Sequence, residues 1–350
     1  MYSLVYIRIL IIFIGLININ NNLQSFVDGS LYVKGPYLFD KGDLVLLRGI
    51  ARPSLEWWPY GEKLSMKDYQ NMKDWGSNVV RLSLNQDYWL NTSKHYNADY
   101  KDTINTQVEM IKSLGMYVIL DLHWSDDGDL QGSPSQKIMA DQNSIQFWKE
   151  LAETYKNDTN VVFEMYNEPM FKSWYIWRNG GLFKGKKYVG MQQLLDTIRN
   201  TGANNVVIAN GMRWGFDLYH VKSFLLDGYN IMYGTHPYNF TDKASKYWDH
   251  HFGDLSEKFP IIATEFGEFT CESVYTEEFI DYADRKGIHW TAWGWFPKDC
   301  LFPSLIVDWD GTPSKSGKAV KHYLSKFKKN NNNNNNNNNI IPPSQEDLLD

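Results

Sequence analysis

The chain repeats one pattern, a short apolar run rich in β-branched and aromatic residues followed by a longer amphipathic segment. Short apolar runs of this kind are typical of strands that are buried on both faces, as in a parallel sheet. Residues 161–169 show this most clearly, because the apolar run ends at Pro169, which cannot donate a ladder hydrogen bond. Eight strands are predicted in this way, near residues 44–50, 76–81, 116–123, 161–169, 205–209, 229–236, 260–265 and 288–295.

Segments with the period of an amphipathic helix lie between these strands. In 143–156, Ile145, Phe147, Trp148 and Leu151 form one apolar side, and Gly115 is suitably placed to end the helix before it. The predicted helices cover residues 66–75, 99–114, 143–156, 188–199, 245–258, 276–286 and 314–327, and a long loop covers 170–187.

Strands that alternate with helices in this way predict an α/β fold, a closed (β/α)8 TIM barrel in a single domain. The alternative is a doubly wound open sheet with a glycine-rich phosphate loop after its first strand. Residues 48–53 contain no such G-x-G-x-x-G motif, so the barrel is favoured.

The two ends of the chain differ in composition from the middle. Arg8 precedes an apolar run at 9–19, which is too short to span a membrane and suits a signal peptide, predicted at 1–25. An uncleaved anchor remains the alternative. The folded domain is expected at 26–329, and the asparagine-rich tail at 330–350 is expected to be disordered.

Secretion is therefore expected, with no membrane attachment after cleavage, and the protein is expected to be a monomer. Three glycosylation triplets, at Asn91, Asn157 and Asn239, are compatible with that route. In an oxidising compartment Cys271 and Cys300 could pair, although two free buried thiols are also possible. A net charge of −6 and the absence of long basic runs argue against a nucleic-acid partner.

Polar side chains gather where the predicted strands end, and in a barrel the carboxyl ends of all strands meet at one face. Glu168 and Glu265 each close an apolar strand and are predicted to be the working pair. Four other carboxylates are weaker candidates for the catalytic pair. Glu164 and Asp121 lie deeper in their strands, and Glu56 and Glu268 belong to loops that are expected to be mobile. The other groups expected at this face are Arg81, His123, Asn167, Asn210, Trp214, His236, Tyr238, Trp293 and Trp295.

Two carboxylates that face each other across a polar bowl support glycosidic cleavage, in which one must be protonated while the other is ionised. The histidines show no H-E-x-x-H motif and no matched Cys/His spacing, so no metal or other cofactor is predicted.

Six segments of the chain resemble glycoside hydrolase family 5, the cellulase family, and follow the family order between about residues 31 and 327. These segments are Val-Val-Arg81-Leu, Asp-Leu-His123-Trp, Tyr-Asn167-Glu168-Pro, Thr-His236-Pro-Tyr238, Thr-Glu265-Phe-Gly and Ala-Trp293-Gly-Trp295. The resemblance implies a retaining mechanism in which Glu168 is the acid/base and Glu265 is the nucleophile.

The same resemblance implies supporting residues. Asn167 would bind the sugar 2-hydroxyl, and His236 would adjust the acid/base. Arg81 and Tyr238 would steady the nucleophile. His123 and Trp293 would line the subsite of the attacked sugar, so these six residues form the expected substrate-binding set.

Many aromatic residues fall in loops after strands, and flat rings suit the faces of pyranose sugars in a long cleft. A row of such rings predicts a polymer rather than a disaccharide as substrate. The resemblance to the cellulase family implies a β-linked polysaccharide and makes an endo-β-1,4-glucanase the leading interpretation, with a β-mannanase as the nearest alternative. Two further alternatives are a transglycosylase and a non-catalytic carbohydrate-binding wall protein. The tryptophans expected in the cleft are Trp57, Trp58, Trp89, Trp124, Trp174, Trp177 and Trp214.

Overall fold

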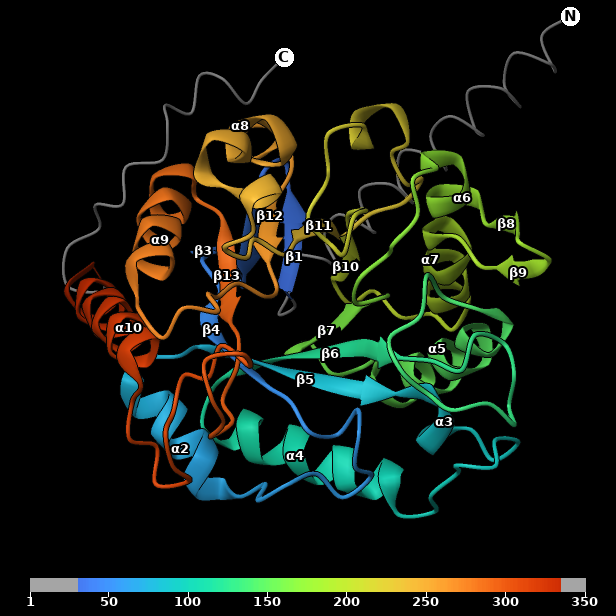
Figure 1. Ribbon diagram of the computed structural model, residues 1–350, viewed down its shortest axis with the longest axis horizontal. Helices are drawn as coiled ribbons and strands as arrows, with labels where there is room; N and C mark the ends of the chain where they lie inside the picture. The colour runs from blue at the N-terminus through green and yellow to red at the C-terminus, as the bar shows by residue number, and fades with distance from the viewer. Residues whose placement is uncertain (1–30, 335–350) are drawn as a thin grey trace, which may run out of the picture.

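The computed structural model describes residues 31–334. Eight parallel strands close into a barrel with helices around it (Figure 1), which confirms the predicted (β/α)8 fold. The barrel strands, in order around it, are β4 (Arg48–Arg52), β5 (Val79–Asn85), β6 (Tyr117–Trp124), β7 (Val161–Glu164), β10 (Val207–Asn210), β11 (Ile231–Thr235), β12 (Ile261–Ala263) and β13 (His289–Ala292).

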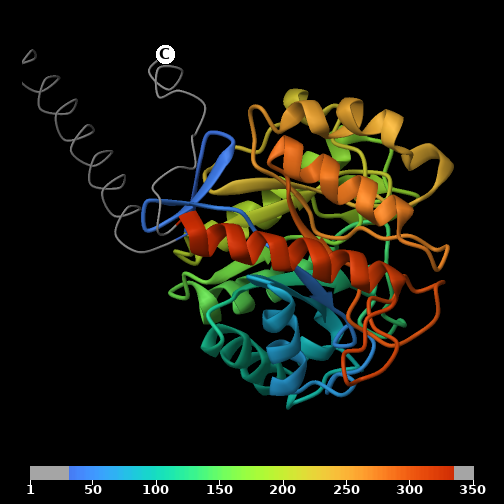
Figure 2. The same cartoon turned by 90° about the vertical axis from the view of Figure 1, so that its left-hand side faces the viewer.

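Six of the seven predicted amphipathic segments correspond to an outer helix. Helix α10 lies between α2 and α9 on the outside of the barrel (Figure 2), so the last helix packs beside the first. The main helices are α2 (Met66–Trp75), α4 (Tyr100–Ser113), α5 (Gln142–Tyr155), α7 (Met191–Asn200), α9 (Val274–Lys286) and α10 (Lys315–Asn334), and the short ones are α3 (Gln86–Trp89), α6 (Trp174–Asn179) and α8 (Trp248–His251).

Three parts of the prediction were wrong in detail. The expected helix 245–258 is broken into α8 and short 3-10 turns, because the chain turns at Gly253, where the hydroxyl of Tyr282 occupies the space of a Cβ. The loop 170–187 contains α6 and a hairpin of β8 (Gly181–Phe183) and β9 (Lys186–Tyr188). The expected first strand, 44–50, is divided between two sheets.

A small antiparallel sheet precedes the barrel and was not predicted. It consists of β1 (Leu31–Lys34), β2 (Tyr37–Asp40) and β3 (Asp43–Val45). Leu31 and Leu38 of this sheet pack in one cluster with Val79 and Ile119 from β5 and β6. The sheet therefore covers one end of the barrel interior.

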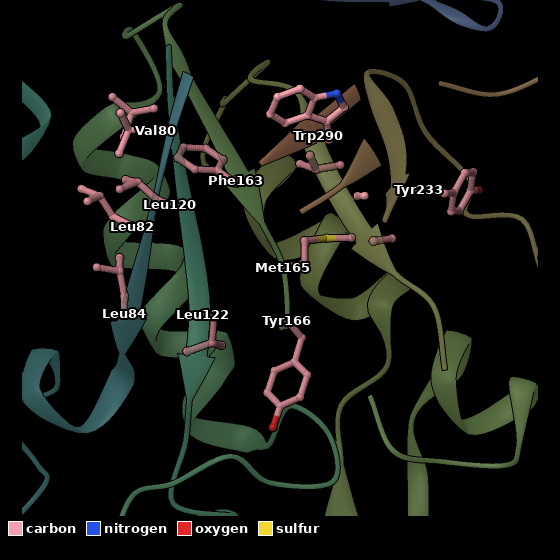
Figure 3. Close-up of a cluster of buried hydrophobic side chains, with 14 of the residues drawn as sticks. Val80, Leu82, Leu84, Leu120, Leu122, Phe163, Met165, Tyr166, Tyr233 and Trp290 are labelled. Atoms are coloured by element: carbon pink, nitrogen blue, oxygen red, sulfur yellow. The ribbon is translucent and has the colours of Figure 1, made fainter. Parts of the chain in front are cut away.

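Alternation along the strands sorts side chains into two sets. Val80, Leu82 and Leu84 of β5 lie in the core between strands and helices together with Phe163 of β7 (Figure 3). The side chains that alternate with these face the barrel interior, where one apolar layer consists of Val79, Ile119, Val162, Ile208, Met232 and Ile262. Because side chains alternate with a period of two, the residues two positions further on also face inward, and five of these are polar: Arg81, Asp121, Glu164, Asn210 and Thr264.

Cys271 and Cys300 form a disulfide, with their Cα atoms 4.8 Å apart, so the first of the two possibilities for these cysteines is correct. Helix α10 runs to Asn334, beyond the domain boundary expected at 329. The expected signal peptide, residues 1–25, and the tail after residue 334 lie outside the described residues. Within 31–334 no helix has the length and apolarity needed to cross a membrane.

Candidate active site

Glu265 lies two residues beyond the end of β12, and both of its carboxylate oxygens are held by donors. Arg81 Nη1 donates to Oε1 over 2.7 Å, and the Tyr238 hydroxyl donates to Oε2 over 2.7 Å. Burial and the negative charge of Glu265 raise the pKa of Tyr238 well above its usual value. Tyr238 is therefore a stable hydrogen-bond donor, and the orientation of the Glu265 carboxylate is fixed from two sides.

Glu168 lies four residues beyond the end of β7 and is held through its two oxygens by different groups. Its Oε1 is 2.9 Å from His236 Nδ1, and its Oε2 accepts a hydrogen bond from the side-chain amide of Gln136. His236 Nε2 is 2.8 Å from the hydroxyl of Thr264. The ring of His236 is thus fixed at both nitrogens, and Nδ1 is directed at Glu168.

The charges of Glu168 and His236 depend on each other. Burial acts to lower the pKa of His236, but the charge of Glu265, the Glu164 carboxylate 3.8 Å away and the hydrogen bond with Glu168 outweigh it and raise this pKa to about 9. Burial acts to raise the pKa of Glu168, but the hydrogen bond and charge of His236, together with the charge of Lys243, hold it below its ordinary value. At neutral pH the proton shared by this pair therefore resides mainly on His236.

The two glutamates lie close together. One oxygen of Glu168, one oxygen of Glu265 and one nitrogen of His236 all lie within 4.8 Å of one another. Carboxyl groups separated by about 5–5.5 Å suit a double displacement, whereas inversion needs about 6.5–9.5 Å to admit a water molecule. These three side chains could also surround a metal ion, but a protonated imidazole offers no lone pair and the Arg81 guanidinium stands beside Glu265, so hydrogen bonding fits the group better.

A buried polar layer supports the pair from inside the barrel. Arg81 also donates to Glu164, over 2.6 and 2.9 Å, and to Asn167 Oδ1 over 2.7 Å, and its Nη2 lies 2.9 Å from Asp121. Glu164 further accepts hydrogen bonds from Asn210 Nδ2 over 2.5 Å and from the Thr264 hydroxyl over 2.8 Å. Asp121 and Glu164 are fully buried, so they act as counter-ions of Arg81 and do not reach the cleft.

His123 of β6 connects this layer to the cleft. Its Nδ1 lies 2.6 Å from Asp121 and its Nε2 lies 3.3 Å from the amide nitrogen of Asn167. Its ring stacks on Trp293, with 5.6 Å between ring centroids and 11° between planes. Both rings line the cavity above Glu265 and offer a flat wall to a ligand.

The site opens into a cavity of about 470 Å³. A second hollow lies further along the same face, and Phe302 joins the two because its ring contacts both Trp293, at 5.5 Å, and Trp57, at 6.1 Å. The groups that line the first cavity are His123, Gln136, Asn167, Glu168, Trp214, Tyr238, Phe240, Asp242, Lys243, Glu265, Phe269 and Trp293. Those that line the second are Trp57, Glu62, Trp124, Phe296, Lys298 and Phe302.

The structure brings all eight residues of the expected catalytic and substrate-binding set together at one end of the barrel. Six of them line the cavity. Arg81 and His236 are fully buried, which places them behind the two glutamates rather than in contact with a ligand.

Several other sequence expectations need correction. Glu56 and Glu268 are not on mobile loops but are buried, and burial raises the pKa of Glu56 to about 7. Trp295 and three tryptophans expected in the cleft are also buried, because they pack in the core: Trp89, Trp174 and Trp177. Trp58 and Trp214 are about half exposed, and Trp57 and Trp124 are partly exposed in the second hollow.

Gln136 and Lys243 line the cavity beside Glu168 and were not found from the sequence. Both belong to segments without strand or long helix periodicity, so no pattern indicated which way their side chains point. Thr264 was also missed, although it directly precedes Glu265 and the period of two along β12 could have placed it.

The chain matches the family described as cellulase (glycosyl hydrolase family 5) over residues 41–299. It is 30% identical to endoglucanase A of Butyrivibrio fibrisolvens over 71% of this chain and 54% of the relative. It is 28% identical to endoglucanase 5 of Pectobacterium carotovorum subsp. carotovorum over 85% of this chain and 55% of the relative. The chain thus spans about half the length of these relatives.

Among solved structures the chain resembles a β-glucanase of Saccharophagus degradans in complex with cellotetraose. The TM-score is 0.71 at 24% identity, and the match covers 86% of this chain and 94% of the other. At this identity the likeness concerns the fold alone.

Proposed function

The chain belongs to the cellulase family, glycosyl hydrolase family 5, and from that premise we propose that it is a retaining endo-β-1,4-glucanase. The observation that carries the proposal is the approach of Glu168 and Glu265 to within 4.8 Å, oxygen to oxygen. A gap of this size leaves no room for a water molecule between carboxylate and sugar, so it favours direct attack by one carboxylate.

In the proposed first step Glu265 attacks the anomeric carbon. Arg81 and Tyr238 hold its two oxygens, so the carboxylate stays correctly turned until the bond forms. His236 passes its proton to Glu168 through the 2.9 Å contact, and Glu168 donates it to the departing glycosidic oxygen, which leaves Glu168 ionised and His236 neutral. The products are a free sugar hydroxyl and a glycosyl ester on Glu265.

In the proposed second step Glu168 is ionised and removes a proton from water, which attacks the ester and releases the sugar with retained configuration. The pair of Glu168 and His236 regains its single proton. The low pKa of Glu168 in the unliganded site suits this base role. For the acid role, bound sugar would exclude water around Glu168 and favour its protonated form.

A β-1,4-glucan is the proposed substrate for two reasons. The relatives that match the chain are named endoglucanases, and a β-glucanase with the same fold binds cellotetraose. Both hollows are lined by aromatic rings, which suit the flat faces of sugar units in a polymer chain.

We further propose that the protein is secreted as a monomeric glycoprotein after removal of residues 1–25. Asn91 and Asn157 are exposed and open to glycosylation. Asn239 is partly buried and its side-chain oxygen accepts a hydrogen bond from the backbone of Phe269, so it is the least suitable of the three.

The test compares carboxymethylcellulose and a β-mannan as substrates, with viscosity and reducing ends measured together. We expect a rapid fall in viscosity with few reducing ends on carboxymethylcellulose, which is the signature of internal cleavage. Cleavage of the mannan alone would replace the substrate assignment. Binding of both polymers without cleavage would favour a carbohydrate-binding protein, and longer oligosaccharide products would favour transglycosylation.

A further inference from the structure

Helix α10 presents a basic face to solvent that the proposed mechanism does not use. Every exposed position between residues 315 and 328 of this helix is a lysine or a histidine. At about 100° per residue these positions fall within an arc of about 160°, so they form one stripe along the outside of the molecule (Figure 2). The residues of this basic stripe are Lys315, Lys318, Lys321, His322, Lys326 and Lys328.

The described carboxylates leave most of the basic stripe unpaired. Lys315 is paired with Glu272 over 2.7 Å, and no other lysine of the stripe forms an ion pair with a residue of the described part of the chain. Three carboxylates of α9 lie close enough to act on Tyr323 of α10, but each already bonds to a group outside the stripe. These pairs are Glu277 with Ser273, Asp281 with Tyr323 and Asp284 with Arg48.

Helix α2 adds a further cation beside the carboxyl-terminal half of the stripe. Burial and the charge of Lys328 both lower the pKa of Lys73. The Lys73 ammonium donates to the backbone carbonyl of Gly115 over 3.4 Å, which is a neutral acceptor. Because like charges repel, a negative group placed between Lys73 and Lys328 would stabilise both.

The stability of α10 itself does not account for the stripe. The amino end of a helix carries a positive partial charge, so cations there are unfavourable, yet α10 begins with Lys315 and has no acidic residue in its first turn. Lys318 is followed by Lys321 three positions on and by His322 four positions on, which are spacings at which like charges on a helix repel. A ligand with negative charges would relieve this repulsion.

The shape of the stripe indicates the kind of ligand. Between Lys318 and Lys328 the helix rises by about 15 Å, which suits a polymer with repeated negative charges better than one small anion. A hollow of about 410 Å³ lies beside the stripe, between α9 and α10. The whole chain has a net charge of −6 although α10 contains no carboxylate. A broad anionic surface would therefore meet acidic neighbours such as Glu277, whereas a single polymer chain can follow the stripe alone.

We propose, resting on the function proposed above, that the basic stripe is a docking surface for an acidic polysaccharide whose sugar units carry carboxylates. None of the stripe residues lines the active-site cavity or the second hollow. An acidic chain on the stripe and a neutral glucan in the cleft can therefore be bound at the same time. Docking would hold the enzyme in material where the two polymers are mixed.

The test measures binding of the whole protein to polygalacturonate, with hydroxyethylcellulose as the neutral glucan. The stripe variant replaces Lys318, Lys321 and Lys328 together by glutamine. The matched control replaces three exposed lysines elsewhere by glutamine, Lys222, Lys246 and Lys258. Each variant loses three charges and one contact of a lysine with an aromatic ring, of Lys321 with Trp75 or of Lys246 with Tyr247.

We expect the Kd of the wild type for polygalacturonate to rise about tenfold between about 20 and about 200 mM NaCl, because salt screens exposed charges. The stripe variant should bind roughly tenfold or more weakly and the control within about twofold of the wild type, since each exposed ion pair contributes little alone. Both variants should keep the wild-type kcat/KM on hydroxyethylcellulose.

Absence of binding by the wild type, or equal losses in the two variants, would overturn the docking surface. Preference for vesicles of anionic phospholipid or for duplex DNA over polygalacturonate would overturn it as well. A wild type that binds polygalacturonate through the stripe but cleaves no glucan would refute the proposed glucanase activity and leave the docking surface supported.

Discussion

Replacing Arg81 by methionine removes the cation at the centre of the buried polar layer. The guanidinium bonds to Glu164 and Glu265 and lies 2.9 Å from Asp121, and all three carboxylates are buried. Removing one partner of a buried ion pair costs about 3–5 kcal/mol, because the remaining charge stays uncompensated. With three carboxylates affected, we expect the free energy of unfolding to fall by about 5 kcal/mol at pH 7, the upper end of that range.

Urea unfolding followed by tryptophan fluorescence measures this loss, with Arg48→Met as the matched control. Arg48 is equally buried, at 2% exposure, but its partner Asp284 is half exposed and can be hydrated when the arginine is removed. The control should therefore lose clearly less stability. Equal losses in the two variants would refute the argument that uncompensated buried charge is the cause.

The pH dependence of the Arg81→Met loss provides a second check. In the wild type the Arg81 charge outweighs burial and holds the pKa of Glu164 below its ordinary value, so the stability from this group is present above the unfolded pKa of about 4.3 and is lost only at lower pH. In the variant the Arg81 charge no longer offsets burial, so the folded pKa values of Glu164 and Asp121 rise and protonation relieves the uncompensated charge. The gap between variant and wild type should therefore shrink from pH 7 to pH 5, and a constant gap would contradict the account.

Two further predictions concern the loops and the proton of the site. Replacing Cys271 and Cys300 together by serine opens a loop with a sequence separation of 29 residues and should cost about 3 kcal/mol in unfolding free energy, measured by urea titration against the oxidised wild type. In the wild type the pKa of His236 is raised to about 9, so its charge stabilises the fold fully below its unfolded pKa near 6.5, and this contribution is lost as pH rises through 9. The stability advantage of the wild type over His236→Gln should therefore decline between pH 6.5 and 9.5 in urea titrations, and an advantage that grows with pH would contradict the assignment of a protonated His236.

The fold could be predicted from the sequence because the barrel strands are continuous apolar runs and the helices between them are amphipathic. The range 66–75 matches α2 at both ends, since Ser65 caps it and Gly76 ends it in a left-handed conformation. The sheet of β1 to β3 escaped prediction because its strands are only three or four residues long. Runs of that length show too few alternations to establish a period.

The site residues could be predicted from the sequence where the ends of the strands could be located. Glu168 and Glu265 stand just beyond their strands, where all barrel strands converge. The burial of loop residues could not be predicted from the sequence, because it depends on tertiary contacts. Glu56, for example, is buried through a hydrogen bond from the Ser54 backbone and one from Asn85 to its own carbonyl, and neither partner is marked by sequence spacing.

The central claim is that Glu265 attacks the sugar and Glu168 supplies the proton. The most direct test incubates the protein with dinitrophenyl 2-deoxy-2-fluoro-β-cellobioside, whose fluorine slows hydrolysis of the glycosyl ester, and then measures the intact mass and maps the labelled peptide. We expect one fluorocellobiosyl group on Glu265 and none in Glu265→Gln. A label on another residue, or turnover of the unfluorinated glycoside with inverted configuration and no label, would contradict the account.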